Sequence, residues 1–358
     1  MKVIITSPSL DPNKNVSGIS SVTQFIIKNI PQKEYIHFEL GKKDNEKGGI
    51  YRIKAIIKSL INWNKTLNKY PDAIIHYNFP LSKFSIIRDP LFIMIARLKK
   101  RAMIIHLHGG SFLTKTDIPR FYNWILKKVF SLPIPFIVLS DIEKNIIRKK
   151  YQPTNIQILP NCIELGDASL FNRNINLENP LTIGYIGRIA ETKGMEYLLE
   201  TAQILKKRKI PFLLKIAGKE EIEKQYLPDF EKALGNQFIY AGLVSGKTKY
   251  IFLKSLDVFI LPSFFEGLPM SLLECMSYGT VPLTTNVGSI GKVVKNEFNG
   301  LMITPKDANS IVEKFIFLHE HRELLRKYSE TAKNTIFSEY NPNIYINKLS
   351  SIYDSIRS

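Results

Sequence analysis

Short runs of β-branched apolar residues alternate with longer stretches of helical periodicity along the 358-residue chain. Such alternation is typical of βαβ units, in which buried parallel strands are covered by helices on both faces. The expected strands of the first half are 3–6, 73–77, 103–107 and 136–139, and those of the second half are 182–186, 212–217, 237–240, 258–261, 281–284 and 301–303. The pattern predicts an α/β protein with two doubly wound parallel sheets.

The length supports the same division, because domains usually contain about 100 to 200 residues. A stretch at 165–180 is rich in Asn, Asp and Gly and has no sustained periodicity, so we expect the linker there. The predicted domains are 1–165 and 166–341. A last helical pattern, at 342–358, is compatible with packing on either domain, including a return to the first.

Charge is distributed unevenly along the chain. Residues 1–175 contain 27 basic and 12 acidic side chains, a net charge of +15, out of +18 for the whole chain. The asymmetry indicates a polyanionic partner for the first half: anionic lipid headgroups, nucleic acid or a phosphorylated substrate. A surface that merely keeps the protein in solution is the alternative.

Cysteine content and hydropathy indicate the compartment. Cys162 and Cys275 are too few for a disulfide framework, and residues 1–10 have the pattern of a strand rather than of a signal peptide. No apolar run reaches the roughly 18 residues that a membrane span needs, since charged residues and a proline interrupt the best candidate, 84–98. We therefore expect a cytoplasmic protein that does not cross a membrane.

In the second half, strand 182–186 runs into two cations flanked by glycines, Gly187-Arg188 and Lys193-Gly194. The glycines allow both cations to turn toward one dianion, and Arg offers a two-pronged donor where Lys offers a compact charge. A diphosphate fits this arrangement. Two solvated surface cations are the alternative.

The most informative segment follows strand 258–261. Glu266 and Gly267 begin a loop, and Pro269 is placed like the first-turn proline of a helix that carries Glu274. Carboxylates beside backbone donors suit a polyhydroxylated ligand, although a Glu at a helix start can also be only a dipole partner. The N–H groups expected to face the same cleft are those of Leu268, Met270 and Ser271.

Two weaker signals lie in the first half. After strand 3–6, a small-residue turn containing Ser17 and Gly18 leads into a helix, which lets N–H groups approach a phosphate or sugar. A plain capped turn is the alternative. Strand 103–107 ends at His108, followed by two glycines that permit close approach of a ligand. Two imidazoles are too few for a metal site, and the chain has no Asp-x-Asp pair, so we expect no metal.

Taken together, these motifs resemble a known family. Glu266 and Glu274 form an E-x7-E pattern, and the other matching pieces are Gly187-Arg188, Lys193-Gly194, Pro160-Asn161, His108-Gly109 and Gly288. In order and spacing the set is similar to the retaining glycosyltransferases of family 4, which have the GT-B fold of two Rossmann-like domains facing an interdomain cleft. The resemblance covers most of residues 100–305.

The resemblance implies a nucleotide-diphosphate sugar, UDP- or GDP-linked, as the donor, and neither a cofactor nor a metal. Arg188 and Lys193 would hold the diphosphate, Glu274 the ribose hydroxyls, and Glu266 with the amides after Gly267 the hydroxyls of the transferred sugar. The second domain would thus bind the donor.

For the first domain, the resemblance implies a bound acceptor, with His108 close to the anomeric carbon and Ser17-Gly18 close to the phosphates. The departing phosphate would accept the proton of the acceptor on the same face, so that configuration is retained. The implied activity is transfer to a lipid-linked or glycan acceptor in the biosynthesis of a bacterial capsule, O-antigen or exopolysaccharide.

This chain departs from the family pattern at three loops. Lys219-Glu220 stands where a second glycine is common, Gly288-Ser289-Ile290-Gly291-Lys292 replaces a Gly-Gly-x-x-Glu, and Asn161-Cys162-Ile163-Glu164 replaces Asn-Gly-Val-Asp. These changes affect the expected contacts to the base and the phosphates rather than the reaction.

Three helical patterns of the first half combine apolar and basic residues, at 51–70, 91–101 and 121–130. In the first, Ile53, Ile56, Ile57, Leu60, Ile61 and Leu67 are expected on one stripe. Peripheral attachment to the inner face of an anionic membrane is one interpretation. The alternative is that these stripes simply cover the sheet.

Two other functions remain open. A GT-B sugar-nucleotide epimerase would also bind such a donor, but the E-x7-E pattern argues against it. A basic nucleic-acid-binding protein would use the positive first half, yet no recognition motif or interleaving of aromatic residues with Arg is present, so we expect no nucleic-acid partner.

Overall fold

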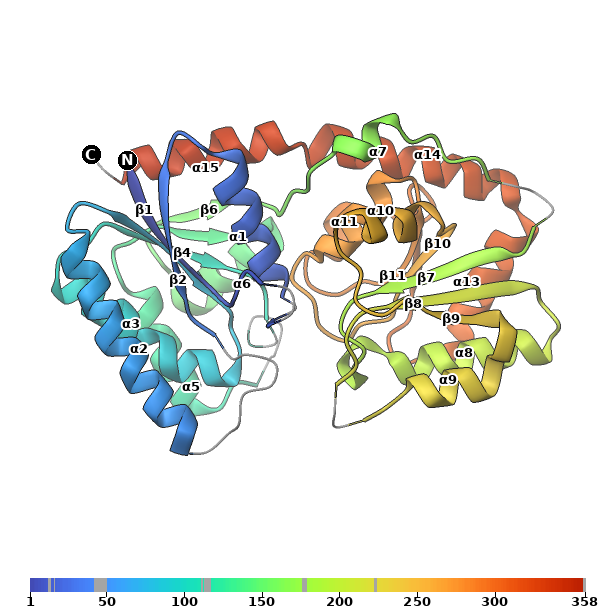
Figure 1. The fold of residues 1–358 in the computed structure, drawn as a ribbon, viewed down its shortest axis with the longest axis horizontal. Coiled ribbons are helices and arrows are strands. Elements are labelled where there is room, and N and C mark those ends of the chain that lie inside the picture. Colours follow the sequence, from blue (N-terminus) through green and yellow to red (C-terminus); the bar gives the residue numbers. More distant parts are fainter. Residues whose placement is uncertain are drawn as a thin grey trace. The chain divides into compact units, whose positions relative to one another are not determined.

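The computed structural model describes residues 1–11, 14–15, 17–41, 50–110, 112, 117–175, 179–221 and 224–356. The chain divides into two compact units (Figure 1): unit 1 is Met1–Asn161 with Asn343–Ser358, and unit 2 is Cys162–Pro342. The predicted domain boundary after residue 165 therefore falls just inside unit 2.

Unit 1 is built around a six-stranded parallel sheet of strand order β2-β1-β3-β4-β5-β6. Its strands are β1 (Lys2–Ser7), β2 (Glu34–Glu39), β3 (Ile74–Phe79), β4 (Met103–Leu107), β5 (Phe136–Val138) and β6 (Ile156–Ile158). Its helices are α1 (Gly18–Asn29), α2 (Ile50–Lys69), α3 (Lys83–Leu98), α5 (Arg120–Phe130), α6 (Asp141–Tyr151) and α15 (Pro342–Ser355). Strands β3 and β4 are buried along their whole length, as the apolar runs predict.

Unit 2 contains a second six-stranded parallel sheet, of strand order β12-β11-β10-β7-β8-β9. Its strands are β7 (Leu181–Ile186), β8 (Phe212–Ala217), β9 (Phe238–Tyr240), β10 (Val258–Leu261), β11 (Val281–Thr285) and β12 (Leu301–Ile303). Its helices are α7 (Gly166–Leu170), α8 (Met195–Lys207), α9 (Leu227–Leu234), α10 (Gly246–Lys254), α11 (Met270–Ser277), α12 (Ile290–Val293), α13 (Ala308–Glu320) and α14 (Arg322–Glu339).

The predicted fold class is confirmed: both sheets are parallel, doubly wound and flanked by helices. Each of the ten predicted strands is present, and the prediction missed β2 and β6. Strand β2 lies at the sheet edge and is mostly half-buried or exposed, so its side chains lack a continuous apolar run. Strand β6 spans only Ile156–Ile158, too short for a clear pattern.

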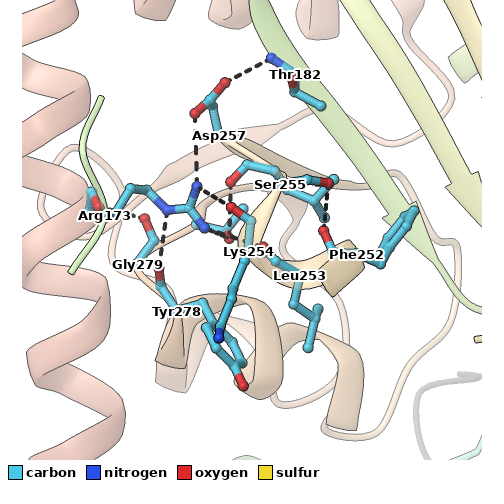
Figure 2. A network of polar contacts seen from close by, with 12 residues as sticks. Arg173, Thr182, Phe252, Leu253, Lys254, Ser255, Asp257, Tyr278 and Gly279 are labelled. Carbon is cyan, nitrogen blue, oxygen red and sulfur yellow. Dashed lines mark hydrogen bonds and ion pairs between the residues drawn. The ribbon is translucent and has the colours of Figure 1, made fainter. Parts of the chain in front are cut away.

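The stretch predicted as the linker is packed into unit 2 at least through Arg173. Figure 2 shows the Arg173 guanidinium among main-chain carbonyls, donating to those of Tyr278 at 3.0 Å, Lys254 at 3.3 Å and Leu253 at 3.2 Å. Its Nη1 also lies 3.8 Å from Asp257 Oδ1. Burial lowers the pKa of Arg173 to about 10, so it remains a cation at neutral pH. The prediction failed here because Asn-rich composition does not reveal one buried arginine.

The C-terminal helix α15 returns to unit 1 and completes its core. Tyr353 is fully buried, and its hydroxyl lies 2.6 Å from His76 Nδ1 on β3. At the surface, Lys33 pairs with Asp354 at 2.9 Å. Unit 1 is therefore discontinuous in sequence.

No helix in the described part of the chain is both long enough and apolar enough to span a bilayer.

Candidate active site

In unit 2, the loops that carry Arg188, Lys193 and Glu266 leave from the point where the strand order reverses. In unit 2, β7 and β10 are neighbours, while β8 and β9 extend to one side of them and β11 and β12 to the other. The loop after β7 carries Arg188 and Lys193, and the loop after β10 carries Glu266. Since all the strands are parallel, both loops leave from the same sheet edge, where open α/β sheets bind ligands.

Lys193 and Glu266 form an ion pair there. The Lys193 Nζ lies 2.6 Å from Glu266 Oε1, and the side chains are 25% and 11% exposed. A hydrogen bond between ionised partners in a partly desolvated position is strong and directional. The structure thus brings together two predicted residues that lie 73 positions apart in the sequence.

Two glycines hold these loops against each other. Gly194 begins helix α8 in the left-handed region, at φ 76°, and a Cβ at this position would clash with the Pro262 carbonyl oxygen. Nearby, the Phe264 N–H donates to the Thr192 carbonyl at 2.9 Å. Gly288, at φ 58°, packs on the Glu266 main chain so closely that a Cβ would clash with its carbonyl oxygen. The close approach of three loops therefore depends on glycine.

Arg188 lies in the same group of loops but has a different partner. Its Nη1 is 3.4 Å from Glu221 Oε1, and both side chains are well exposed, at 43% and 39%. Beneath them, the buried Tyr185 hydroxyl donates to the Arg188 carbonyl at 2.6 Å. Burial first, and then the Glu266 carboxylate, raise the pKa of Tyr185, so it remains a neutral donor. An exposed pair such as Arg188–Glu221 contributes only about 0–1 kcal/mol, so a phosphate can displace Glu221 at little cost.

Glu274 is held by a lysine that sequence reasoning missed. Its Oε1 lies 2.6 Å from the Lys249 Nζ on α10, with the side chains 20% and 26% exposed respectively. Nothing in the sequence links α10 to the E-x7-E segment, because helix periodicity relates residues within one helix and not between two. Lys249 therefore holds the carboxylate predicted for the ribose hydroxyls.

Helix α11 starts beside Glu266. It begins at Met270, with Pro269 as its N-cap residue rather than in its first turn as predicted. Its first intrahelical hydrogen bond runs from Leu273 N to the Pro269 carbonyl at 3.4 Å. The N–H groups of Met270 and Ser271 precede that bond, so they have no partner within the helix. Leu268 is buried and anchors the loop.

One departure from the family pattern has a structural explanation. Glu220, in the loop after β8, accepts hydrogen bonds from the N–H groups of Tyr226 at 2.5 Å and Leu227 at 2.8 Å, at the start of α9. A carboxylate is favourable at a helix start, where it satisfies N–H groups that have no intrahelical partner. Glu220 therefore stabilises α9 where many family members have glycine.

In unit 1 the strand order reverses between β1 and β3, and the predicted residues of this unit follow β1 and β4. Ser17 is the N-cap residue of α1 and makes no side-chain capping bond. A Cβ on Gly18 would meet no described atom within 4 Å. A side-chain cap from Ser17, or tight packing around Gly18, would be a structural reason for this turn. Neither is found among the described residues.

His108 is oriented by Asn78, a residue at the end of β3 that sequence reasoning missed. The two side chains meet at 2.7 Å through His108 Nε2 and Asn78 Oδ1. Asn78 Nδ2 donates to the Thr6 carbonyl at 2.6 Å, which fixes the amide with its oxygen toward His108. His108 Nε2 must then carry the proton, and Nδ1 presents a lone pair.

His108 also belongs to a row of three imidazoles, of which His76 and His106 are fully buried and His108 is half-buried. Its ring centre lies 4.1 Å from that of His106 with the two planes tilted, and His106 Nδ1 lies 3.1 Å from His76 Nε2. Burial lowers the pKa of His108 and of His76 to about 3. All three side chains are consequently neutral at physiological pH, so His108 acts as a hydrogen-bonding group rather than as a cation.

Ser17, Gly18 and His108 lie in unit 1, and the other predicted residues lie in unit 2. Within the described ranges, no three His, Cys, Asp or Glu side chains gather in a way that could hold a metal ion. In unit 2, each cation predicted for the diphosphate is paired with a carboxylate, Lys193 with Glu266 and Arg188 with Glu221.

Comparison with known proteins gives a family match for most of unit 2 and relatives for a larger part of the chain. Residues 168–335 match the family described as Glycosyl transferases group 1. Over 314 residues, 83% of this chain and 79% of the relative, the sequence is 26% identical to the Escherichia coli UDP-Gal:alpha-D-GlcNAc-diphosphoundecaprenol alpha-1,3-galactosyltransferase.

A second relative is the Campylobacter jejuni N,N'-diacetylbacillosaminyl-diphospho-undecaprenol alpha-1,3-N-acetylgalactosaminyltransferase, 26% identical over 68% of this chain and 66% of the relative. Among solved structures, sucrose-phosphate synthase from Thermosynechococcus elongatus superposes with a TM-score of 0.79 at 14% identity, covering 99% of this chain and 98% of that one. That likeness shows a shared fold. The family match lies within unit 2, at residues 168–335, and with the relatives and the shared fold it supports a glycosyltransferase of the GT-B fold.

Proposed function

We propose that this glycosyltransferase moves a sugar, with retention of configuration and without a metal, from a nucleotide-diphosphate sugar to a lipid-linked acceptor for a bacterial surface polysaccharide. The observation that carries the proposal is the Lys193–Glu266 pair at the strand-order reversal of unit 2, beside the start of α11. A cation, a carboxylate and unbonded N–H groups suit a ligand that combines phosphates with hydroxyls. The names of both relatives contain a diphosphate-linked undecaprenol acceptor, and one names UDP as the nucleotide.

The charges of unit 2 account for the rate of transfer. Cleavage of the bond between the anomeric carbon and the phosphate oxygen leaves a more negative diphosphate and an oxocarbenium-like sugar. In this proposal Lys193 and Arg188 bind the phosphate and stabilise this transition state more than the ground state. When Lys193 turns to the phosphate, the oxygens of Glu266 become acceptors for sugar hydroxyls. Glu274, held in place by Lys249, accepts from the ribose hydroxyls.

Retention then requires no covalent intermediate on the enzyme. The departing phosphate accepts the proton of the attacking hydroxyl on the face it has just left, so the new bond forms on that same face. Neutral His108 contributes Nδ1 as an acceptor for a hydroxyl of the transferred sugar, since its Nε2–H is engaged by Asn78. The two cations Arg188 and Lys193 take the place that a divalent ion would have at the diphosphate.

A thermal-shift panel of UDP, GDP, ADP and dTDP, each with magnesium and with EDTA, tests donor binding. We expect UDP to raise the unfolding temperature equally in both conditions, because Lys193 and Arg188 neutralise the diphosphate. A flat response to all four nucleotides would contradict the donor site. Proton NMR of the product formed from an α-linked sugar nucleotide tests retention, and a β product would overturn it.

The two alternative functions, sugar-nucleotide epimerase and nucleic-acid binding, predict different experimental results. An epimerase would convert a sugar nucleotide into its epimer with no acceptor present, which chromatography of the nucleotide pool detects. A nucleic-acid binder would retain oligonucleotides on a filter with affinity that falls steeply as salt rises. We expect neither result.

A further inference from the structure

Helix α2 has two apolar stripes, and only one of them faces the core. Trp63 and Leu67 are fully buried on the inner side. Ile53, Ile57 and Ile61, spaced four residues apart, are 53–59% exposed, although the sequence pattern predicted all the apolar residues on a single stripe. Helical periodicity places i, i+4 and i+8 on the same side, so the second stripe is continuous. Because only the inner stripe packs on the core, covering the sheet does not explain this second, exposed stripe.

The neighbouring helices repeat the feature. On α3, Ile87, Leu91, Met94 and Leu98 follow one another at helical spacing and are exposed, the last two at 62% and 79%. On α5, Phe121 and Trp124 are exposed one turn apart. Helix α3 packs against both α2 and α5, and the Arg52 guanidinium of α2 lies 3.4 Å from the centre of the Phe84 ring on α3 (Figure 1). We call the outer sides of α2, α3 and α5 the α2–α3–α5 face.

All the exposed charged side chains of this face are positive. Its three helices contain one carboxylate, Asp89, which is fully buried and paired with Arg88 at 2.5 Å. The exposed cations on these helices are Lys54, Lys58, Lys65, Lys69, Lys83, Arg120, Lys127 and Lys128. A partner for this face must therefore be both apolar and anionic.

We propose that the α2–α3–α5 face binds the surface of an anionic lipid bilayer. The aliphatic residues with Trp124 and Phe121 enter the boundary between headgroups and acyl chains, and the lysines remain among the lipid phosphates, as in helices that lie in the membrane plane. Nucleic acid would satisfy the lysines but would offer nothing to Ile, Leu and Met. A water-exposed face would be expected to be polar, since soluble monomers rarely expose large apolar patches.

Flotation with vesicles of phosphatidylcholine alone, or mixed with phosphatidylglycerol, tests the proposal. We expect the protein to float with the anionic vesicles, to be recovered less with the neutral ones, and to be released partly by salt. The double variant M94E/L98E should lose flotation, and each of K54Q and K58Q should weaken partitioning about fivefold. The matched control I251E/L170E changes two equally exposed aliphatic residues of unit 2 and should float like the wild type.

The proposed lipid-linked acceptor motivates this inference, but the two can fail separately. UDP-induced thermal stabilisation should be the same in wild type and M94E/L98E, so a failed donor site and a failed membrane face give different results, and folding is checked in the same assay. Equal recovery with neutral and anionic vesicles, or undiminished flotation of M94E/L98E, would overturn the proposal. So would a wild-type dimer in sedimentation that M94E/L98E converts to a monomer, because the face would then bind a second copy.

Discussion

At the scale of single residues, the site depends on pairs that hold each other in place. Lys193 and Glu266 are within 2.6 Å, and replacing either leaves a partly buried charge without its partner. Lys193→Gln should lower kcat/KM by about 10²- to 10³-fold, the typical cost of losing one donor to a developing anion. Transfer of a radiolabelled sugar measures it.

The matched control is Lys224→Gln, which removes another lysine of unit 2 from a pair with glutamate. Lys224 and Glu196 are 3.4 Å apart and more than half exposed, so this change should leave both activity and stability nearly unchanged. Equal losses in the two variants would show that Lys193 contributes nothing specific.

Asn78 sets the protonation of His108 through Thr6. In Asn78→Asp a carboxylate replaces the amide oxygen 2.7 Å from the imidazole, which raises the pKa of His108 from about 3 toward its ordinary value. In the wild type, titration of His108 should not affect activity above pH 5. The variant should lose activity as the pH falls through the raised pKa of His108. A pH–rate profile measures the shift, and Asn78→Ser, which adds no charge, should lower the rate without creating a new acid limb.

At the scale of elements, glycines decide how closely the loops approach. Gly194 and Gly246 both have a left-handed φ, but a Cβ clashes with the Pro262 carbonyl only at Gly194. Gly246→Ala should therefore cost only about 1 kcal/mol, from backbone strain. Gly194→Ala should cost more and should also weaken stabilisation by UDP, because it displaces Lys193. Urea unfolding and thermal shift measure the two effects, and identical behaviour of the variants would contradict this role for Gly194.

Arg173 fixes the segment before β7, so its replacement should destabilise unit 2. Arg173→Ala removes the donor to three partly buried carbonyls, of which that of Leu253 keeps another donor, and should lower the free energy of unfolding of unit 2 by about 2–4 kcal/mol. Arg173→Lys keeps the charge but supplies a point donor in place of a fork, so it should recover only part of the loss. Urea denaturation followed by fluorescence is the measurement.

Elements with strong periodicity could be predicted from the sequence, and long-range partners could not. The ten predicted strands, the loops after β7 and β10, and the helix after Pro269 follow from local patterns. Lys249, Glu221 and Asn78 escaped prediction because each is defined by a contact with a residue 25 or more positions away. The second stripe of α2 escaped for another reason: periodicity shows which residues share a side and not which side is covered.

At the scale of the whole molecule, the buried imidazoles make stability depend on pH. Burial, and secondarily His108, lower the pKa of His76 to about 3, and burial lowers that of His106 well below its usual range. The unfolded chain binds these protons near pH 6.5, so stability is constant above that pH and falls below it, by about 1.4 kcal/mol per pH unit for each histidine.

Unfolding free energies of the wild type and His106→Gln, measured between pH 7.5 and 5, test this dependence. The variant removes one titrating group and keeps a polar partner for His76, so its slope should be about 1.4 kcal/mol per pH unit smaller below pH 6.5. Parallel slopes would mean that His106 is accessible to protons in the folded protein.

The return of α15 to unit 1 bears on how the protein is made. The ribosome synthesises the strands of unit 1 before unit 2, yet the core around His76 lacks Tyr353 until every strand of unit 2 has been added. Unit 1 is therefore completed after unit 2. A nonsense codon in the segment that encodes α15 would spare unit 2 and leave unit 1 incomplete, a target for proteases although none of its strands is missing.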